Sequence, residues 1–308
     1  MTERGRRAAS LEQLRVLRSR FSATESVARG LAYRASPTDV FIATYPKCGM
    51  TWLQQILHCL RTGGDSDFDE VTAVVPWLEM ADAMSIDPSA PQRAQPRVFK
   101  THLLYERIPK GGRYIHMVRN PADVLVSMFH FHEGWLLEPG AVSLNSTRSS
   151  SSFWAGAAVT TGSFRLPGGH IGTITICYIA HEQLLASPAK TIARIVAFAG
   201  LALDDELLAL TFTLSGIAYM KAHEHQFDDH LFRAVTDPQY VLPADNRSTK
   251  VREGKAGAGN TRLSTRVHAA LDEQWATEMG VPFGLRNYAA LTEQFLREEP
   301  LRFPSLFS

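Results

Sequence analysis

The sequence has no long apolar run, little cysteine and almost no net charge. None of its hydrophobic stretches approaches the roughly 20 residues that a membrane-spanning helix needs, and its first residues lack the apolar core of a secretory signal. Formal net charge is +1 over 308 residues, so overall charge gives no reason to expect a nucleic acid as partner. The three cysteines, Cys48, Cys59 and Cys177, are odd in number and lack metal-ligand spacing, which indicates reduced thiols.

The composition is that of a soluble globular protein, with 45% hydrophobic and 20% charged residues. A chain of this length is long enough for one large domain. We expect that domain to cover residues 39–308, after a basic helical extension at residues 1–38. The first 21 residues are rich in arginine, with leucines at helical spacing, so a transit peptide stays open beside a basic first helix. We predict a cytoplasmic protein.

Strand patterns alternate with helix patterns along the chain. FIATYPKCGMTWLQQIL at residues 41–57 predicts a strand, a tight loop and a helix. RVFKTH at 97–102 predicts a buried strand, and RYIHMVRNPADVLV at 113–126 predicts a strand and a helix that opens at Pro121. This alternation predicts an α/β fold in a single domain, with a central, mostly parallel sheet flanked by helices and ligands at the carboxyl ends of the strands. Residues 144–172, rich in serine and glycine, predict an irregular insertion or loop.

Lys47 lies in the first of these loops, beside a helix N-terminus. The N–H groups at a helix start have no partner within the helix and attract anions, so the loop predicts a site for phosphate or sulfate, or no ligand at all. An ATP-binding P-loop needs the pattern G-x-x-x-x-G-K-[ST], whereas this loop has only Gly49, placed after the lysine. Trp52 follows, and its indole either stacks on a nucleobase or anchors the helix in the core.

The segment TYPKCGMTW resembles the first signature of the cytosolic-type sulfotransferases, Y-P-K-S-G-T-T-W, with cysteine and methionine at two of its positions. The resemblance implies a P-loop-like nucleotide-binding fold. In that fold the loop cradles the 5′-phosphosulfate of the co-substrate 3′-phosphoadenosine 5′-phosphosulfate (PAPS). The residues that take this role by resemblance are Lys47, Cys48, Gly49, Met50, Thr51 and Trp52.

Two later segments strengthen the resemblance. RNPADVLVSMFHF at 119–131 is similar to the family stretch that grips the 3′-phosphate, and KVREGKAGAG at 250–259 resembles the C-terminal R-K-G-x-x-G loop. The residues at the phosphate-binding positions are Arg119, Ser127, Arg252, Glu253 and Gly254. Glu253 replaces the usual lysine, although Lys250 and Lys255 flank it. Each motif alone also fits a surface ion pair, a solvent-facing serine or a solvated turn, but the order of all three favours the family.

VFKTHL resembles the family's strand-end K-T-H motif. This implies that His102 takes the proton from an acceptor hydroxyl, with Lys100 as its electrostatic companion. A histidine suits a general base because its ordinary pKa is near neutral, whereas a lone histidine is more often structural. The resemblance also implies an in-line displacement at sulfur in which Lys47 neutralises the developing charge, without a metal. His130 and His132 are expected to line or support the acceptor side.

Other positions depart from the family pattern. In CYIAHEQLLASP, His181 stands where a tyrosine often contacts the nucleotide, and in LSGIAYMK, Ser215 and Ile217 replace a threonine and a phenylalanine that hold the adenine. Ser215 keeps a hydroxyl donor, while Ile217 cannot stack aromatically. A nucleotide pocket looser than that of typical members is therefore expected.

The acceptor is predicted only by class. HFHEGWLLEPGAV at 130–142 offers apolar and aromatic surface, which favours the hydroxyl of a small, hydrophobic molecule or a lipid. An alternative is a sulfotransferase fold that binds nucleotide but has lost acceptor binding and catalysis. A kinase using ATP and magnesium is disfavoured, because its GKS or GKT loop is absent. The sequence leaves the oligomeric state open.

Overall fold

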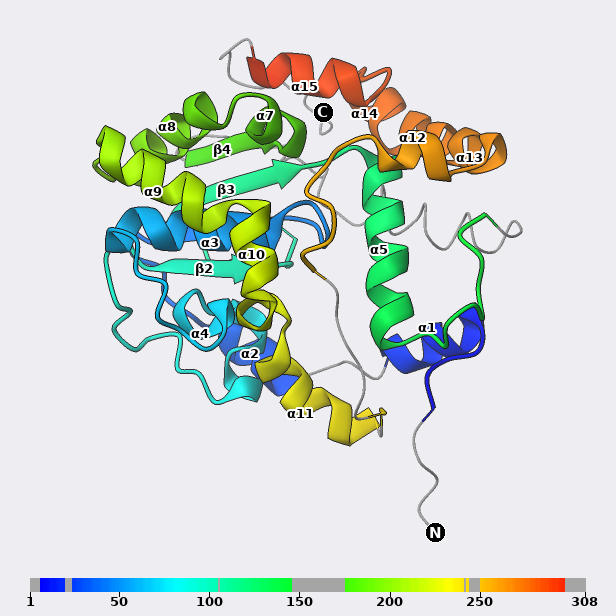
Figure 1. Cartoon of the computed structure of the whole chain (residues 1–308), viewed down its shortest axis with the longest axis horizontal. Coiled ribbons are helices and arrows are strands. Elements are labelled where there is room, and N and C mark those ends of the chain that lie inside the picture. The colour runs from blue at the N-terminus through cyan, green and yellow to red at the C-terminus, as the bar shows by residue number, and fades with distance from the viewer. Residues whose placement is uncertain are drawn as a thin grey trace.

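Four short parallel strands form the centre of the molecule (Figure 1). The computed structural model describes residues 6–19, 24–104, 106–145, 175–240, 242–243 and 250–296. Within these residues the sheet has the order β2-β1-β3-β4, and each pair of neighbouring strands is parallel. The strands are β1 (Val40–Ala43), β2 (Val98–Thr101), β3 (Arg113–Val118) and β4 (Thr175–Ala180).

Both faces of the sheet are apolar, as expected for parallel strands covered by helices on each side. Along β1, Val40 and Ile42 join one buried cluster with the helix that follows, while Phe41 belongs to a second cluster on the opposite face. Phe41 stacks on Phe99 and Tyr114 there, with ring centroids 5.4 and 5.5 Å apart. The predicted α/β fold with a parallel sheet flanked by helices is confirmed.

Three helices follow strands and begin at the carboxyl edge of the sheet. These are α3 (Met50–Thr62) after β1, α5 (Pro121–Trp135) after β3 and α7 (His181–Ala186) after β4. The other α-helices of the described residues are α1 (Leu11–Ser19), α2 (Thr24–Leu31), α4 (Val71–Val74), α8 (Pro188–Ala199), α9 (Asp205–Ser215), α10 (Ile217–Ala222), α11 (His230–Tyr240), α12 (Ala258–Arg262), α13 (Thr265–Trp275), α14 (Val281–Phe283) and α15 (Tyr288–Leu296).

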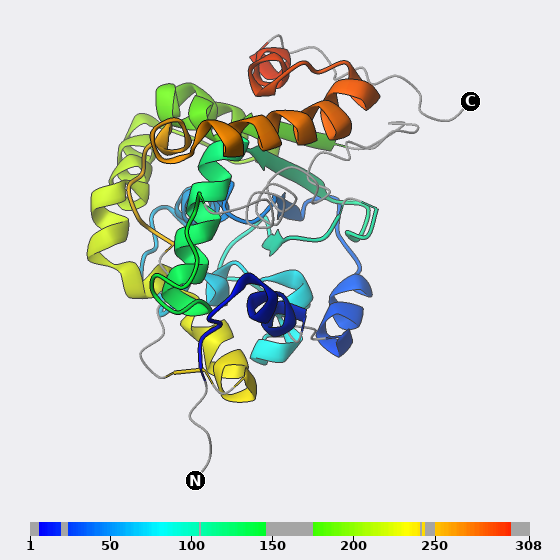
Figure 2. The ribbon, with the colours of Figure 1, turned by 90° about the vertical axis from the view of Figure 1, so that its right-hand side faces the viewer.

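Helix α5 crosses the carboxyl ends of the strands (Figure 1). At its N-terminal end it contacts α12, where a Cβ built on Gly259 would lie 2.4 Å from the Cβ of Ala122, so only glycine permits this approach. Figure 2 shows α13 lying across the same end. At the other end, the N–H of Ala8 donates to the carbonyl of Leu136 at 2.7 Å, which holds the segment before α1 against α5.

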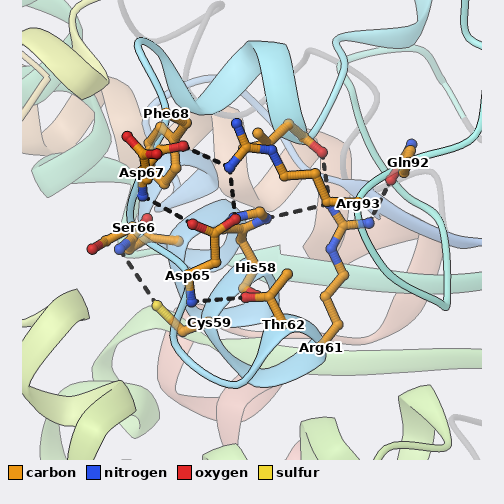
Figure 3. Close-up of polar contacts among 12 residues, drawn as sticks. His58, Cys59, Arg61, Thr62, Asp65, Ser66, Asp67, Phe68, Gln92 and Arg93 are labelled. Atoms are coloured by element: carbon orange, nitrogen blue, oxygen red, sulfur yellow. Dashed lines mark hydrogen bonds and ion pairs between the residues drawn. The ribbon is translucent and has the colours of Figure 1, made fainter.

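A buried polar network fixes the long segment between α3 and β2 (Figure 3). The Arg61 guanidinium donates to the carbonyls of Val74 at 2.6 Å and Pro96 at 3.1 Å, and also to the Gln92 side chain. Gln92 in turn accepts from the N–H of Val98 at 2.9 Å. Burial lowers the pKa of Arg61 to about 10, so the guanidinium stays charged at neutral pH. The network fixes where β2 starts. Because the strand is short, it thereby also fixes where β2 ends.

Some elements go beyond what the sequence patterns predicted. Residues 204–223 form two helices, α9 and α10, with Gly216 between them. Helix α11 includes Pro238 and lies in a region for which no helix was predicted. The predicted irregular segment 144–172 lies outside the described residues beyond position 145. In the part of the chain that is described, no helix is long and apolar enough to cross a bilayer.

Candidate active site

The loop between β1 and α3 leads directly into the first turn of the helix. Lys47 has φ of 72° and Gly49 has φ of 110°, so the chain turns through the left-handed region twice before α3 begins. No side chain in the described part of the chain caps the helix. The N–H groups of its first turn therefore lack partners within the helix, and the positive end of the helix dipole favours an anion at this position.

Lys47 is held among other positive charges. Its ammonium lies 4.1 Å from the centroid of the Phe131 ring on α5. Burial, followed by the charges of Lys250 and Arg119, lowers the pKa of Lys47 to about 7. An anion bound here would relieve that repulsion and restore the charge of the lysine. The thiol of Cys48, by contrast, is buried in the core, so this predicted site residue offers its backbone rather than its side chain.

Arg119 follows β3 and joins two loops. Its Nη1 donates to the carbonyl of Lys47 at 3.2 Å and its Nη2 to the carbonyl of Lys255 at 3.4 Å. Its Nε is buried and has no hydrogen-bond partner among the described residues. Ser127, two turns along α5, lines the same cavity. The arginine and serine predicted to grip a phosphate are thus brought to one place with the Lys47 loop.

The loop at 250–257 is fixed to α5 through Asp123. Its buried carboxylate accepts from the N–H of Gly257 at 2.8 Å and of Gly259 at 2.7 Å. Glu253 forms ion pairs with Arg252 and with Arg262, the latter at 2.6 Å. Part of the positive charge predicted for this loop is therefore neutralised within the loop itself.

We expect Asp123→Asn to loosen this loop. An amide presents an NH₂ group where the carboxylate now accepts two N–H bonds, so the free energy of unfolding should fall by about 1–3 kcal/mol. Urea unfolding measures that loss, and limited proteolysis should show faster cleavage within residues 250–257. Asp272→Asn, on an exposed position of α13, is the matched control. An unchanged unfolding midpoint in Asp123→Asn would show that the two hydrogen bonds do not hold the loop.

The predicted nucleobase side gathers residues from four segments. The rings of Trp52 and His181 lie 5.5 Å apart, edge to face. His181 Nδ1 is buried without a partner in the described residues, and burial lowers the pKa of His181 to about 3. Ile217 packs on Gly254, whose φ is 63°. The hydroxyl of Ser215, predicted as a donor to the nucleotide, donates here to the carbonyl of Thr211 at 2.6 Å.

His102 lies just beyond β2, where its ring is oriented by the backbone. Nδ1 is 2.7 Å from the carbonyl of Thr44, and because a carbonyl only accepts, Nδ1 carries the proton and Nε2 keeps a free electron pair. The N–H of His102 donates to Glu79 at 2.7 Å. Burial, then the charge of Lys100, lowers the pKa of His102 to about 3, so the ring is neutral at physiological pH.

Lys100 is buried beneath the same end of the cavity. Its ammonium lies 4.1 Å from the centroid of the Trp77 ring and 3.6 Å from the carboxylate of Asp229. Burial lowers the pKa of Lys100 to about 8, against the opposing effect of Asp229. The predicted companion of His102 is thus a residue with its own buried counter-ion.

Aromatic side chains form the other part of the cavity. The Phe232 ring on α11 lies 5.0 Å from Trp77 and 6.1 Å from Trp135, and Phe131 lies 5.4 Å from Trp135. Together with the loops above they enclose about 580 Å³, which is the size of a small-molecule site. His132 lines this part, whereas His130 faces Glu133 and Arg262.

A cluster beside the cavity has the spacing of a metal site. Glu70, Asp228 and His230 bring ligand atoms within 4.8 Å of one another. His230 already bonds to Asp228 at 2.9 Å and to Asp69 at 2.8 Å. Burial acts to lower its pKa, but these hydrogen bonds raise it above the ordinary value. The cluster is therefore explained without a metal, as a network of hydrogen-bonded ion pairs. This network ties α11 to the segment before α4.

The chain belongs to the sulfotransferase family. A family model for the sulfotransferase domain matches residues 37–280, which confirms the family predicted from the sequence. Rat sulfotransferase 1C2 is 23% identical over 266 residues, which cover 80% of this chain and 85% of that relative. Dog sulfotransferase 1B1 is 26% identical over 278 residues, which again cover 80% of this chain and 85% of that relative.

Solved structures share the fold at lower identity. Mouse sulfotransferase SULT7A1 complexed with PAP superposes with a TM-score of 0.58 at 20% identity, covering 85% of this chain and 91% of that chain. Retinol dehydratase in complex with androsterone and inactive cofactor PAP gives a TM-score of 0.58 at 18% identity, covering 92% and 88%. These similarities establish the fold class.

Proposed function

We propose that this protein transfers a sulfuryl group from PAPS to a hydroxyl of a small, hydrophobic acceptor, and that it does so in the cytoplasm. One observation carries the proposal. His102, whose Nε2 keeps its electron pair, lines the same cavity as the loop that favours anions at Lys47 and a wall of aromatic rings. A general base must reach the hydroxyl while an electrostatic site holds the donor, and the three parts meet in one cavity.

The residues fit an anionic nucleotide. Arg119 Nε and His181 Nδ1 are buried polar atoms without partners in the described residues, and buried polar groups are normally hydrogen-bonded. Lys47 has a depressed pKa that an anion would raise. Trp52 offers an aromatic face beside them. We infer that Lys47 and the start of α3 hold the phosphosulfate, and that Arg119, Ser127 and the loop at 250–257 hold the 3′-phosphate.

The bound donor supplies a sulfuryl group and a phosphate leaving group. Nε2 of His102 takes the proton of the acceptor hydroxyl, while the carbonyl of Thr44 keeps the ring in the tautomer that frees Nε2. Lys47 places positive charge where the leaving oxygen becomes negative. The negative charge of the donor also offsets Lys100, whose charge lowers the pKa of His102, so donor binding strengthens the base.

We expect 3′-phosphoadenosine 5′-phosphate (PAP) to release measurable heat on titration. Transfer should appear with phenols, sterols or long-chain alcohols, because the aromatic wall excludes large polar chains. Radiolabelled sulfate transfer to a panel that includes polysaccharides measures this. Transfer to polysaccharides alone would contradict the acceptor class, and failure to bind PAP would contradict the proposal as a whole.

The ion pairs of Glu253 favour a second candidate. They remove positive charge from the loop at 250–257 and so loosen its hold on the 3′-phosphate, as expected for a fold that still binds nucleotide but no longer aligns it for sulfate transfer. PAP binding without transfer to any acceptor of the panel would support this candidate instead.

The division of the chain into an extension at residues 1–38 and a sulfotransferase domain at residues 39–308 stays a prediction.

A further inference from the structure

A buried carboxylate links two of the lysines around the cavity. Asp229 immediately precedes α11, has φ of 58° and is 4% exposed. Its Oδ1 lies 3.6 Å from Lys100 Nζ and in direct contact with Lys250 Nζ. Burial alone would raise the pKa of Asp229, but the charges of Lys100 and Lys250 lower it below the ordinary range. A non-glycine residue in this backbone region is strained, and such strain is concentrated at functional sites.

The charges around Lys47 do not balance. The charged and titratable groups that act on it or face it are Lys100, Lys250, Arg119, Asp229 and His132. Asp229 pairs with Lys100 and Lys250 and acts on Lys47 only at longer range, so three ammonium groups face a single carboxylate, and an unpaired buried charge is unfavourable. The cluster therefore carries more positive than negative charge, and the excess lies beside His102.

Lys250 differs from the other basic residues of its loop. Its side chain is 9% exposed, and it points its ammonium at Asp229. Arg252 is paired with Glu253, while Lys255 is exposed and meets Arg119 through its backbone carbonyl. Glu253 thus neutralises positive charge at the rim of the loop, whereas Lys250 places a positive charge inside the cavity.

We propose that Lys250 is a third ammonium group of the transfer site, acting with Lys47 and Lys100 on the anionic group of the donor, and that Asp229 is its positioning residue. The inference rests on the proposed function, because it assigns the balancing anion to the donor. When the anion binds, it takes the place of Asp229 as the main counter-charge of Lys47 and Lys250. Lys47, partly neutral before binding, then takes up a proton.

Proton uptake gives a test that does not depend on activity. PAP is titrated into the full chain by calorimetry in buffers of different ionisation heat, between pH 6 and pH 9. Removing a neighbouring positive charge raises the pKa of a lysine, and removing a negative charge lowers it. The pH at which uptake is half-maximal should therefore rise in Lys250→Met and fall in Asp229→Asn, each by on the order of one pH unit.

Two further variants separate this coupling from a loss of structure. In Asp229→Asn combined with Lys250→Met, the two shifts should largely cancel. Lys221→Met removes an exposed charge from α10 and should leave the midpoint unchanged. Lys250→Met should also weaken PAP binding about 10- to 100-fold, as loss of a charged hydrogen-bonding group does. A variant that merely disturbs folding would weaken binding without moving the midpoint in a direction set by charge.

The outcomes distinguish a failure of the proposed function from a failure of the role given to Lys250 and Asp229. If the unaltered chain does not bind PAP, the proposed function fails and the inference fails with it. If PAP binds and both single variants keep the midpoint of the unaltered chain, the inference alone is overturned. Opposite shifts that cancel in the double variant, together with weaker PAP binding in Lys250→Met, would establish Lys250 and Asp229 as parts of the transfer site, whereas PAP binding as tight as in the unaltered chain would overturn the role of Lys250.

Discussion

Replacing His102 with asparagine should reduce sulfuryl transfer by about 10²–10⁴-fold while leaving PAP binding intact. Asparagine keeps a side-chain N–H that can donate to the carbonyl of Thr44, as Nδ1 does now at 2.7 Å, but it has no Nε2. The variant therefore removes the base and preserves its anchor. Steady-state rates at saturating PAPS, together with PAP titration, measure the two effects separately. His102→Ala should lose the same activity, since the base is absent in both.

The pH profile gives a second measure of this residue. Burial, then the charge of Lys100, lowers the pKa of His102 to about 3 from an ordinary 6.5. The bound donor offsets the charge of Lys100 but not the burial, so the acid limb of transfer should lie between these two values. The base acts when unprotonated, so activity falls as the pH drops through that limb. His268→Asn, on α13 and away from the cavity, should keep both the rate and the limb. A His102→Asn enzyme with more than a tenth of the original rate would exclude this residue as the base.

The sequence was sufficient to predict the positions at the carboxyl edge of the sheet. Lys47, His102 and Arg119 each follow a strand, and strands β1, β2 and β3 are parallel neighbours. Their ends must therefore meet along one edge, whatever the details of packing. This is why residues separated by more than 70 positions could be assigned to one site before any contact was known.

Asp229 and Phe232 could not be predicted in the same way. Asp229 lies just before α11 and Phe232 lies in its first turn, and the helix contains Pro238, a residue that argues against a helix when the sequence is read alone. They reach the cavity because the ion pair of His230 with Asp69 holds α11 against a segment 161 residues earlier. Neither periodicity nor a motif encodes that contact, since it depends on tertiary packing.

The direction of individual side chains was the other property that could not be predicted from the sequence. Cys48 and Glu253 both occupy motif positions, yet the thiol of Cys48 is in the core and Glu253 is paired with Arg252 and Arg262. A motif fixes the path of the backbone more firmly than the partners of each side chain. Arg262, one partner of Glu253, lies nine residues further along the chain, on the next helix. Only the folded loop brings these two residues together.

Lys47→Met should damage both nucleotide binding and transfer. Methionine keeps an apolar stem that can rest on Phe131, against which the ammonium now lies at 4.1 Å, but it carries no charge. Loss of a charged hydrogen-bond donor should weaken PAP binding about 10- to 100-fold. Transfer should fall further, by on the order of 10²–10³, because the charge is needed most when the leaving oxygen becomes negative.

The contrast with His102 makes this prediction specific. Lys47→Met should raise the dissociation constant of PAP and lower the maximal rate, whereas His102→Asn should lower only the rate. The effect of Lys47 should also shrink as the pH rises above 7, since burial and the charge of Lys250 lower the pKa of Lys47 to about 7 and the unaltered lysine then loses part of its charge. Calorimetric titration of both variants at pH 6 and pH 8.5 measures this difference. Equal PAP affinity in Lys47→Met and the unaltered chain at pH 6 would mean that the loop before α3 does not hold the donor.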